Sequence, residues 1–104
     1  MITSPDPSPE RMSVSRRREH ARLSSHAKRR AKDRSIPDWI VDALFDFGVS
    51  RDAGGGAVSY SFTKRSWRRF AAYVGHLAHH VERYRSVYIV AASDGEVITV
   101  AWRH

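Results

Sequence analysis

A histidine and two arginines recur at four-residue spacing in the segment "HAKRRAKDR", at His26, Arg30 and Arg34. Residues four apart on a helix lie on the same face, so a helix here would align the three side chains in one stripe. Arginine binds phosphate through paired hydrogen bonds, and histidine can exchange a proton near neutral pH. The stripe could therefore bind or cleave a phosphodiester. It overlaps an apolar stripe of Leu23, Ala27 and Ala31.

The protonation of His26 decides which chemistry it could perform. Ser24 is a suitable helix N-cap, which would place His26 in the first helical turn. The positive end of the helix dipole and the nearby arginines both favour the neutral imidazole there, and a neutral imidazole can act as a general base. The alternative is a surface histidine beside a solvated basic helix. The local residues leave both interpretations open.

The positive charge of the 104-residue chain, +7 in total, is concentrated at its beginning. Residues 1–35 carry ten Lys/Arg against four Asp/Glu, whereas residues 36–104 carry eight against seven. An arginine-rich end on a nearly neutral body favours a polyanion partner, because cationic side chains displace counterions from phosphates. A solubilising basic tail is the alternative. We expect nucleic acid, and RNA in particular, as the partner.

Several classes of protein are disfavoured by composition. Cysteine is absent, which excludes disulfides, thiolate catalysis and cysteine-ligated zinc. No apolar stretch reaches the length of a membrane span, and the first residues lack the apolar segment of a secretory signal. We therefore expect a soluble cytoplasmic protein. The first ten residues include three prolines, so we expect residues 1–23 to be a disordered basic leader and residues 24–104 one folded domain.

The elements that must position these side chains can be predicted from periodicity and breaks. The pattern indicates an α+β fold, in which a helical N-terminal half packs on a small antiparallel sheet that ends in a C-terminal β-hairpin. Residues 51–57, "RDAGGGA", are predicted to be a turn or flexible loop. Helices are expected at 24–34, with an extension from Ser15 conceivable, at 37–47, after Thr63 and after Gly75, and strands at 57–62, 86–92 and 97–103.

The terminal hairpin predicts one apolar and one mixed face. A two-residue Asp94-Gly95 turn would pair Ala92 with Val97 and would set the register of the rest. The mixed face would then need solvent or a ligand. The apolar face would contain Val87, Ile89, Ala91, Ile98, Val100 and Trp102, and the mixed face Tyr88, Val90, Thr99, Ala101 and Arg103.

The segment "HAKRRAKDRSIP" resembles the His-Ala-x-x-Arg-x-x-x-Arg-x-Ile opening of small bacterial domains of unknown function. These domains are grouped with RelE-like toxins in the barnase–EndoU–colicin–RelE class of ribonucleases. The final "DGEVITVAWR" is similar to the closing hairpin of that group, so the resemblance covers residues 24–104. It implies a compact α+β fold and metal-independent RNA cleavage. His26, Arg30 and Arg34 match the first-helix motif, and Thr99 and Arg103 match the last strand.

Such cleavage would proceed by attack of the ribose 2′-OH on the adjacent phosphate. His26 would be the base, the arginines would stabilise the developing charge, and Tyr88 or Tyr60 would donate a proton or stack on a base. No cofactor or metal is required. The predicted catalytic residues are His26, Arg30, Arg34, Tyr88, Thr99 and Arg103, and the predicted RNA-binding residues are Lys28, Arg29, Tyr60, Lys64, Arg65 and Arg68.

Two other groups have spacing that could suit a metal. Asp38, Asp42 and Asp46 would share one helical face, although stacked like charges more often form a solvated face, or could dock a basic segment such as the leader. His76 and His80 have zinc-compatible spacing beside His79, but no third ligand is evident. We therefore predict no metal site.

Three functions fit these observations. The first is a toxin-like endoribonuclease, which would have an antitoxin or immunity protein as partner. The second is a nucleic-acid-binding protein that does not cleave, and the third is a phage-type inhibitor that blocks another protein through its charged surface. Cleavage of RNA in the presence of EDTA distinguishes the first from the others.

Overall fold

Two helices form where the apolar spacing predicts them, α2 (Ser25–Asp33) and α3 (Asp38–Phe47). The structure is a computed structural model and describes residues 21–103. The Ser24 hydroxyl caps α2 by accepting a hydrogen bond from the Ala27 amide at 3.0 Å. The conceivable extension from Ser15 and most of the predicted leader lie outside the described residues.

The end of α2 is closed by a left-handed residue that is not glycine. Ser35 has a φ of 56°. Its amide donates to the Lys32 carbonyl at 3.2 Å, and the next amide, of Ile36, donates to the Ala31 carbonyl at 2.8 Å. These two bonds satisfy carbonyls that the helix end would otherwise leave free. Ile36 is buried, so the turn also directs the chain into the core.

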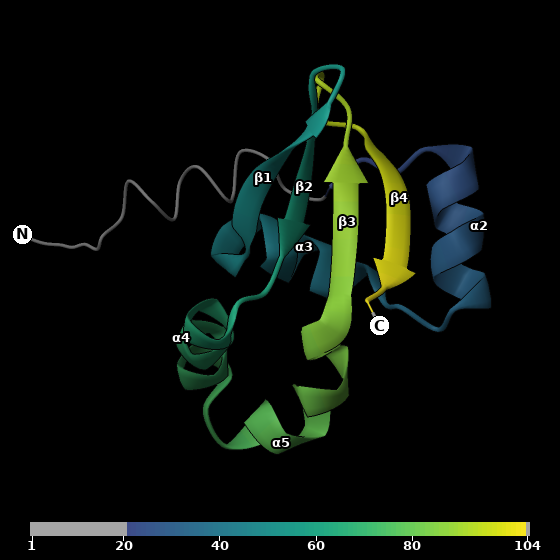
Figure 1. Ribbon diagram of the computed structural model, residues 1–104. Coiled ribbons are helices and arrows are strands. Elements are labelled where there is room, and N and C mark those ends of the chain that lie inside the picture. Colours follow the sequence, from purple (N-terminus) through teal and green to yellow (C-terminus); the bar gives the residue numbers. More distant parts are fainter. Residues whose placement is uncertain (1–20, 104) are drawn as a thin grey trace, which may run out of the picture.

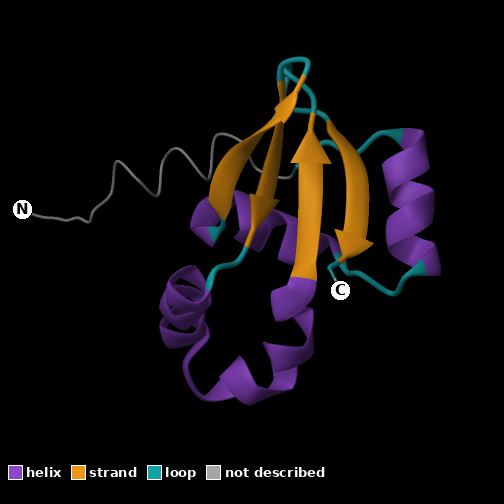
Figure 2. Cartoon of the chain, in the orientation of Figure 1, coloured by secondary structure: helices purple, strands orange, loops and turns teal. Residues whose placement is uncertain are grey.

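The sheet has four antiparallel strands in the order β1-β2-β3-β4 (Figures 1 and 2). α3 lies across one face of it, behind the strands in Figure 1, and buries Ile40, Val41 and Leu44 there. The α+β prediction and the C-terminal hairpin are confirmed. The strands are β1 (Val49–Gly54), β2 (Ala57–Ser61), β3 (Val87–Ala91) and β4 (Val97–Trp102).

The prediction of a turn or flexible loop at residues 51–57 is correct only for the turn at residues 55–56, because residues 51–54 belong to β1 and residue 57 begins β2. All six residues of β1 are exposed, so the strand has no alternating apolar pattern that a sequence could reveal. It exists because it pairs with β2, from Val49 opposite Ser61 to Gly54 opposite Ala57. Gly54, Gly55 and Gly56 all have positive φ values and close the hairpin.

A helical segment connects β2 to β3. It comprises α4 (Lys64–Val74), the short helices η1 (Gly75–Leu77) and α5 (Ala78–Val81), and η2 (Glu82–Ser86). Thr63 caps α4 as predicted, in a reciprocal arrangement with Ser66. Trp67 and Phe70 are buried, which confirms that the apolar stripe of α4 faces the core.

The predicted two-residue turn of the terminal hairpin is wrong by one residue. The Gly95 amide donates to the Ala92 carbonyl, and the Ala92 amide donates to the Glu96 carbonyl, both at 2.8 Å. Gly95 has a φ of 90°. The turn therefore contains three residues, 93–95, with glycine in the left-handed position, which is a common alternative for an Asp-Gly hairpin.

A β-bulge at Ile98 compensates for the longer turn. Val97 pairs with Ala91 and Thr99 pairs with Val90, so Ile98 is the extra residue. Val97 is fully buried, whereas Ile98 is 37% exposed. The predicted faces are thus wrong for Ile98 and correct from Thr99 onward, where Tyr88 also pairs with Ala101 as predicted.

The folded domain begins earlier than residue 24, which is the start predicted from the sequence. Leu23 forms a parallel bridge with Val97. The Val97 amide donates to the Arg22 carbonyl at 2.8 Å, and the Ser24 amide donates to the Val97 carbonyl at 2.9 Å. The Ala21 amide donates to the Asp42 carboxylate at 2.9 Å. Residues 21–23 are therefore part of the sheet edge rather than of a leader.

Within residues 21–103, none of the helices has both the length and the apolar character needed to traverse a bilayer.

Replacing Ser35 with glycine should stabilise the fold. A left-handed backbone strains any residue with a Cβ atom, and glycine removes that strain at a modest entropic cost. We expect Ser35→Gly to raise the free energy of unfolding by about 0.5–1 kcal/mol, measured by urea denaturation. Ser35→Ala is the matched control and should give no gain, because alanine retains the strain. Equal effects of both substitutions would contradict this explanation.

Glu82 should make part of the stability pH-dependent. The Arg85 guanidinium and the Trp67 indole, whose Nε1 donates to Oε1 at 3.0 Å, lower the pKa of the Glu82 carboxyl below its usual value of 4.5. A lowered pKa means that its stabilising contribution is complete above the unfolded-state value and is lost as pH falls through the folded-state value. We expect Glu82→Gln to lower Tm at pH 7 but to differ less from wild type at pH 3. A Tm difference between Glu82→Gln and wild type that is as large at pH 3 as at pH 7 would contradict this explanation.

Candidate functional site

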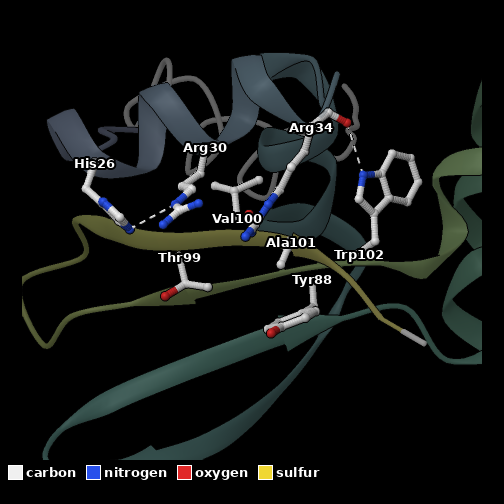
Figure 3. A pocket seen from close by; sticks show the side chains of 8 residues that line it. All are labelled: His26, Arg30, Arg34, Tyr88, Thr99, Val100, Ala101 and Trp102. Atoms are coloured by element: carbon white, nitrogen blue, oxygen red, sulfur yellow. Dashed lines mark hydrogen bonds between the residues drawn. The ribbon is translucent and has the colours of Figure 1, made fainter.

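A pocket of about 550 Å³ lies between α2 and the edge of β4 (Figure 3). Five of the six side chains predicted to be catalytic line it. The lining residues are His26, Arg30, Arg34, Tyr88, Thr99, Val100, Ala101 and Trp102.

The pocket exists because α2 and β4 run side by side in the same direction. The bridge between Leu23 and Val97 fixes the start of both elements. From His26 to Arg34 a helix rises about 12 Å, and from Thr99 to Trp102 a strand extends about 10 Å. The stripe on α2 is therefore matched in length to the strand, and its three side chains point toward β4 (Figure 3).

Arg34 is held in place at two points. Its Nη1 donates to the Val100 carbonyl at 2.8 Å, and its own carbonyl accepts a hydrogen bond from the Trp102 indole Nε1 at 3.0 Å (Figure 3). The side chain is half-buried. Because β4 is the last strand of the sheet, its carbonyls on this side have no neighbouring strand, and Arg34 satisfies one of them. Its other N–H groups remain to bind a ligand.

Arg30 and His26 are hydrogen-bonded to each other. The Arg30 Nε donates to His26 Nε2 at 3.4 Å (Figure 3). The imidazole nitrogen is the acceptor of this bond. Both side chains are exposed to solvent. The histidine is thus neither isolated nor buried: it lies beside a guanidinium that still has four N–H donors.

Among residues 21–103 no acidic residue lines the pocket, so nothing in its described lining neutralises the positive charge. Within residues 21–103 the ion pairs join Arg22 to Asp94 and Arg85 to Glu82, and neither Arg30 nor Arg34 takes part in one. Two guanidinium groups without a carboxylate partner are suited to bind an anion of bidentate geometry, such as phosphate.

Tyr88 and Thr99 contribute hydroxyl groups from the open face of the sheet. They lie on the face that α3 does not cover, and Figure 3 shows them on the other side of β4 from His26 and Arg30. Both residues are half-buried. The pocket therefore continues around the edge of β4, with cationic groups on one side and hydroxyl groups on the other.

Arg103, the sixth predicted catalytic residue, is not in the pocket. β4 ends at Trp102, and the Arg103 amide donates to the Ser86 carbonyl beyond the strand. Arg103 therefore lies outside the group of predicted catalytic residues that line the pocket.

Most of the predicted RNA-binding residues lie elsewhere. Tyr60 packs against Phe45, with ring centroids 4.7 Å apart and the rings tilted by 57°, on the sheet face that α3 covers. Lys28 lines a second hollow beside residues 21–23, and Arg29 is exposed on α2. Lys64, Arg65 and Arg68 are exposed on α4, which lies across the molecule from α2 in Figure 1.

Trp102 lines the pocket, although the sequence does not predict it as a site residue. It packs against the core as the alternation along the strand predicts, but it is only partly buried and so reaches the pocket as well. A tryptophan at the end of an edge strand, next to the arginine stripe, is the signal that could have identified it.

Neither alternative metal group is assembled. Among residues 21–103 no set of three or more histidine, aspartate or glutamate side chains is placed to hold a metal ion. The His79 and His80 rings contact each other, with centroids 3.9 Å apart and an interplanar angle of 40°. Asp42 accepts the hydrogen bond from the Ala21 amide.

The chain shows no significant similarity to any protein-family model, curated protein or solved structure.

The pocket geometry predicts that Arg34 binds phosphate more strongly than arginines of the same helix outside the pocket. With a labelled oligonucleotide as a polyphosphate probe, Arg34→Ala should weaken binding about 10- to 100-fold, the loss of one charge-assisted contact. Arg29→Ala is the matched control, since it removes the same charge from the same helix, and should weaken binding about twofold. Equal losses would mean that only net charge matters.

Proposed function

We propose that this protein is an endoribonuclease that cleaves RNA without a metal ion. The observation that carries the proposal is the grouping of His26, Arg30, Arg34, Tyr88 and Thr99 in one pocket whose lining, within residues 21–103, contains no acidic residue. This group contains a proton acceptor, two cations and two hydroxyls, which are the components of internal phosphoester transfer.

The cleavage step uses the ribose as its own nucleophile. His26 removes the proton of the 2′-OH, and the 2′ oxygen forms a bond to the adjacent phosphorus. The bond from phosphorus to the 5′ oxygen breaks, and that oxygen takes a proton from Tyr88 or from solvent. The products are a 2′,3′-cyclic phosphate and a 5′-OH. Arg30 and Arg34 stabilise the extra negative charge on the phosphorane oxygens.

The hydrogen bond between Arg30 and His26 links phosphate binding to this step. While Arg30 donates to His26 Nε2, the lone pair that would accept the 2′-OH proton is occupied. A phosphate in the pocket is a stronger acceptor for a guanidinium than a neutral imidazole is. We infer that phosphate binding turns Arg30 away from His26 and leaves Nε2 free to act as the base.

The same hydrogen bond favours a second candidate function. If Arg30 stays on His26 when RNA is bound, the protein binds phosphate without cleaving it and is a nucleic-acid-binding protein. The two candidates differ in a single outcome, which is the appearance of cleaved products.

The biological role that fits a ribonuclease of this size is that of a RelE-like toxin acting on RNA in the cytoplasm. The resemblance of the segment from His26 to Pro37 to that group supports this role. An antitoxin that covers the cationic pocket would be its partner. Inducible expression should then arrest growth, and His26→Ala should relieve the arrest.

The decisive test is RNA cleavage by the purified protein in EDTA. We expect fragments that end in 2′,3′-cyclic phosphate, and a loss of at least about 100-fold in rate for His26→Ala, the usual contribution of a general base. His76→Ala removes an exposed histidine outside the pocket and should keep full activity, as should Arg103→Ala.

Circular dichroism and Tm should be unchanged in all three variants, so that any loss of rate reflects chemistry. Intact RNA at every protein concentration, with binding retained, would overturn the ribonuclease proposal and favour the binding function. Equal rates for wild type and His26→Ala would remove His26 from the mechanism.

A further inference from the structure

A row of aromatic rings continues from the pocket around the end of β4. Trp102, which lines the pocket, stacks on Tyr84 with ring centroids 5.9 Å apart and an interplanar angle of 20°. Tyr84 in turn contacts Trp39 edge to face at 5.3 Å. These three rings come from β4, η2 and the first turn of α3, so only the tertiary structure brings them together.

A guanidinium group lies over this row. Arg83 is 5.2 Å from the ring centroid of Tyr84 and 6.0 Å from that of Trp102. The residue is exposed, and within residues 21–103 it takes part in no ion pair. We call Trp39, Tyr84, Trp102 and Arg83 the aromatic strip.

The exposure of Trp39 distinguishes the aromatic strip from ordinary core packing. Trp39 is 43% exposed, whereas Trp67 is 4% exposed and buries its ring against Phe62 and Phe70. An exposed ring that continues a row of rings under a guanidinium, with no ion pair to that guanidinium among residues 21–103, is a feature of surfaces that bind a ligand. Rings and guanidinium planes of this kind stack on the bases of single-stranded nucleic acids.

The aromatic strip adjoins the phosphate-binding groups directly. The Trp102 indole donates to the Arg34 carbonyl at 3.0 Å, so the first ring of the strip is bonded to the residue that ends the cationic stripe. A chain with its phosphate at Arg30 and Arg34 would therefore bring a neighbouring base to the strip. This juxtaposition matches the alternation of phosphate and base along a nucleic acid strand.

We propose that the aromatic strip is a base-stacking subsite that selects single-stranded RNA with an unpaired base next to the bound phosphate. The proposal rests on the proposed function, because it requires a phosphate in the cationic pocket. A double helix cannot use the subsite, since its bases are stacked on one another and paired inside the duplex. The subsite thus restricts the substrate to single-stranded segments and loops.

The test measures the affinity of the protein for one short single-stranded RNA. This affinity is compared with that for abasic analogues, each of which lacks one base but keeps every phosphate, and with that for the duplex form of the same RNA. Wild type should bind the complete strand about tenfold more tightly than it binds at least one abasic analogue, because one stacked base contributes about this much affinity. It should also bind the complete strand about tenfold more tightly than the duplex. In Trp39→Ala and in Arg83→Gln this preference should fall to about twofold or less. Affinity for the abasic strand should stay unchanged in Trp39→Ala.

Tyr73→Ala is the matched control. Tyr73 is an exposed aromatic residue, 68% accessible on α4, outside the aromatic strip, so its removal should leave the preference intact. Arg83→Gln tests the strip even if Trp39→Ala fails to fold, because Arg83 is exposed.

Equal binding of the complete strand and all abasic analogues by wild type would overturn the subsite, whether or not the protein cleaves RNA. So would a preference that persists in both variants. A tenfold preference without cleavage would support the subsite and overturn only the ribonuclease step, so the two failures are distinguishable.

Discussion

The structure depends on the attachment of α2 to the free edge of β4. Backbone hydrogen bonds between Val97 and residues 22 and 24 fix one end, and the Arg34 side chain on the Val100 carbonyl fixes the other. An uncovered edge strand exposes unpaired backbone groups and invites aggregation. Here the helix covers that edge, and the same contact places the basic stripe of α2 against the strand. The contact between α2 and β4 therefore both protects the edge of the sheet and forms the pocket.

The two faces of the sheet have separate roles. α3 buries one face under Ile40 and Leu44, which are among the fully buried residues of the core. The other face carries Tyr88 and Thr99, whose hydroxyls are available to a ligand. Because side chains alternate along a strand, each residue of β3 and β4 serves one role or the other. The bulge at Ile98 preserves this division after the longer turn would have exchanged the faces.

Charge in the pocket is organised for a ligand rather than for stability. Arg30 and Arg34 lie within one helical turn of each other and repel, and no described carboxylate offsets this repulsion. Hydrogen bonds to His26 and to Val100 direct the two guanidinium groups without neutralising them. An anion bound there would relieve the repulsion. The uncharged rings of the aromatic strip extend the same surface past Trp102, so the site offers two kinds of contact to one chain.

Capping and helical periodicity are local properties of the chain, so the sequence is enough to predict the helices, their caps at Ser24 and Thr63, and the stripe of His26, Arg30 and Arg34. The sequence also predicts the pairing of Tyr88 with Ala101, but from a two-residue turn that does not form. The bulge at Ile98 compensates for the three-residue turn and restores that register. The remaining features depend on contacts between segments that are distant in sequence. β1 has no apolar pattern and forms because β2 offers it a partner. The pocket includes Trp102 but not Arg103, because α2 and β4 end at the same level. The helix and the strand are distant in sequence, so the agreement between their lengths appears only when the chain is folded.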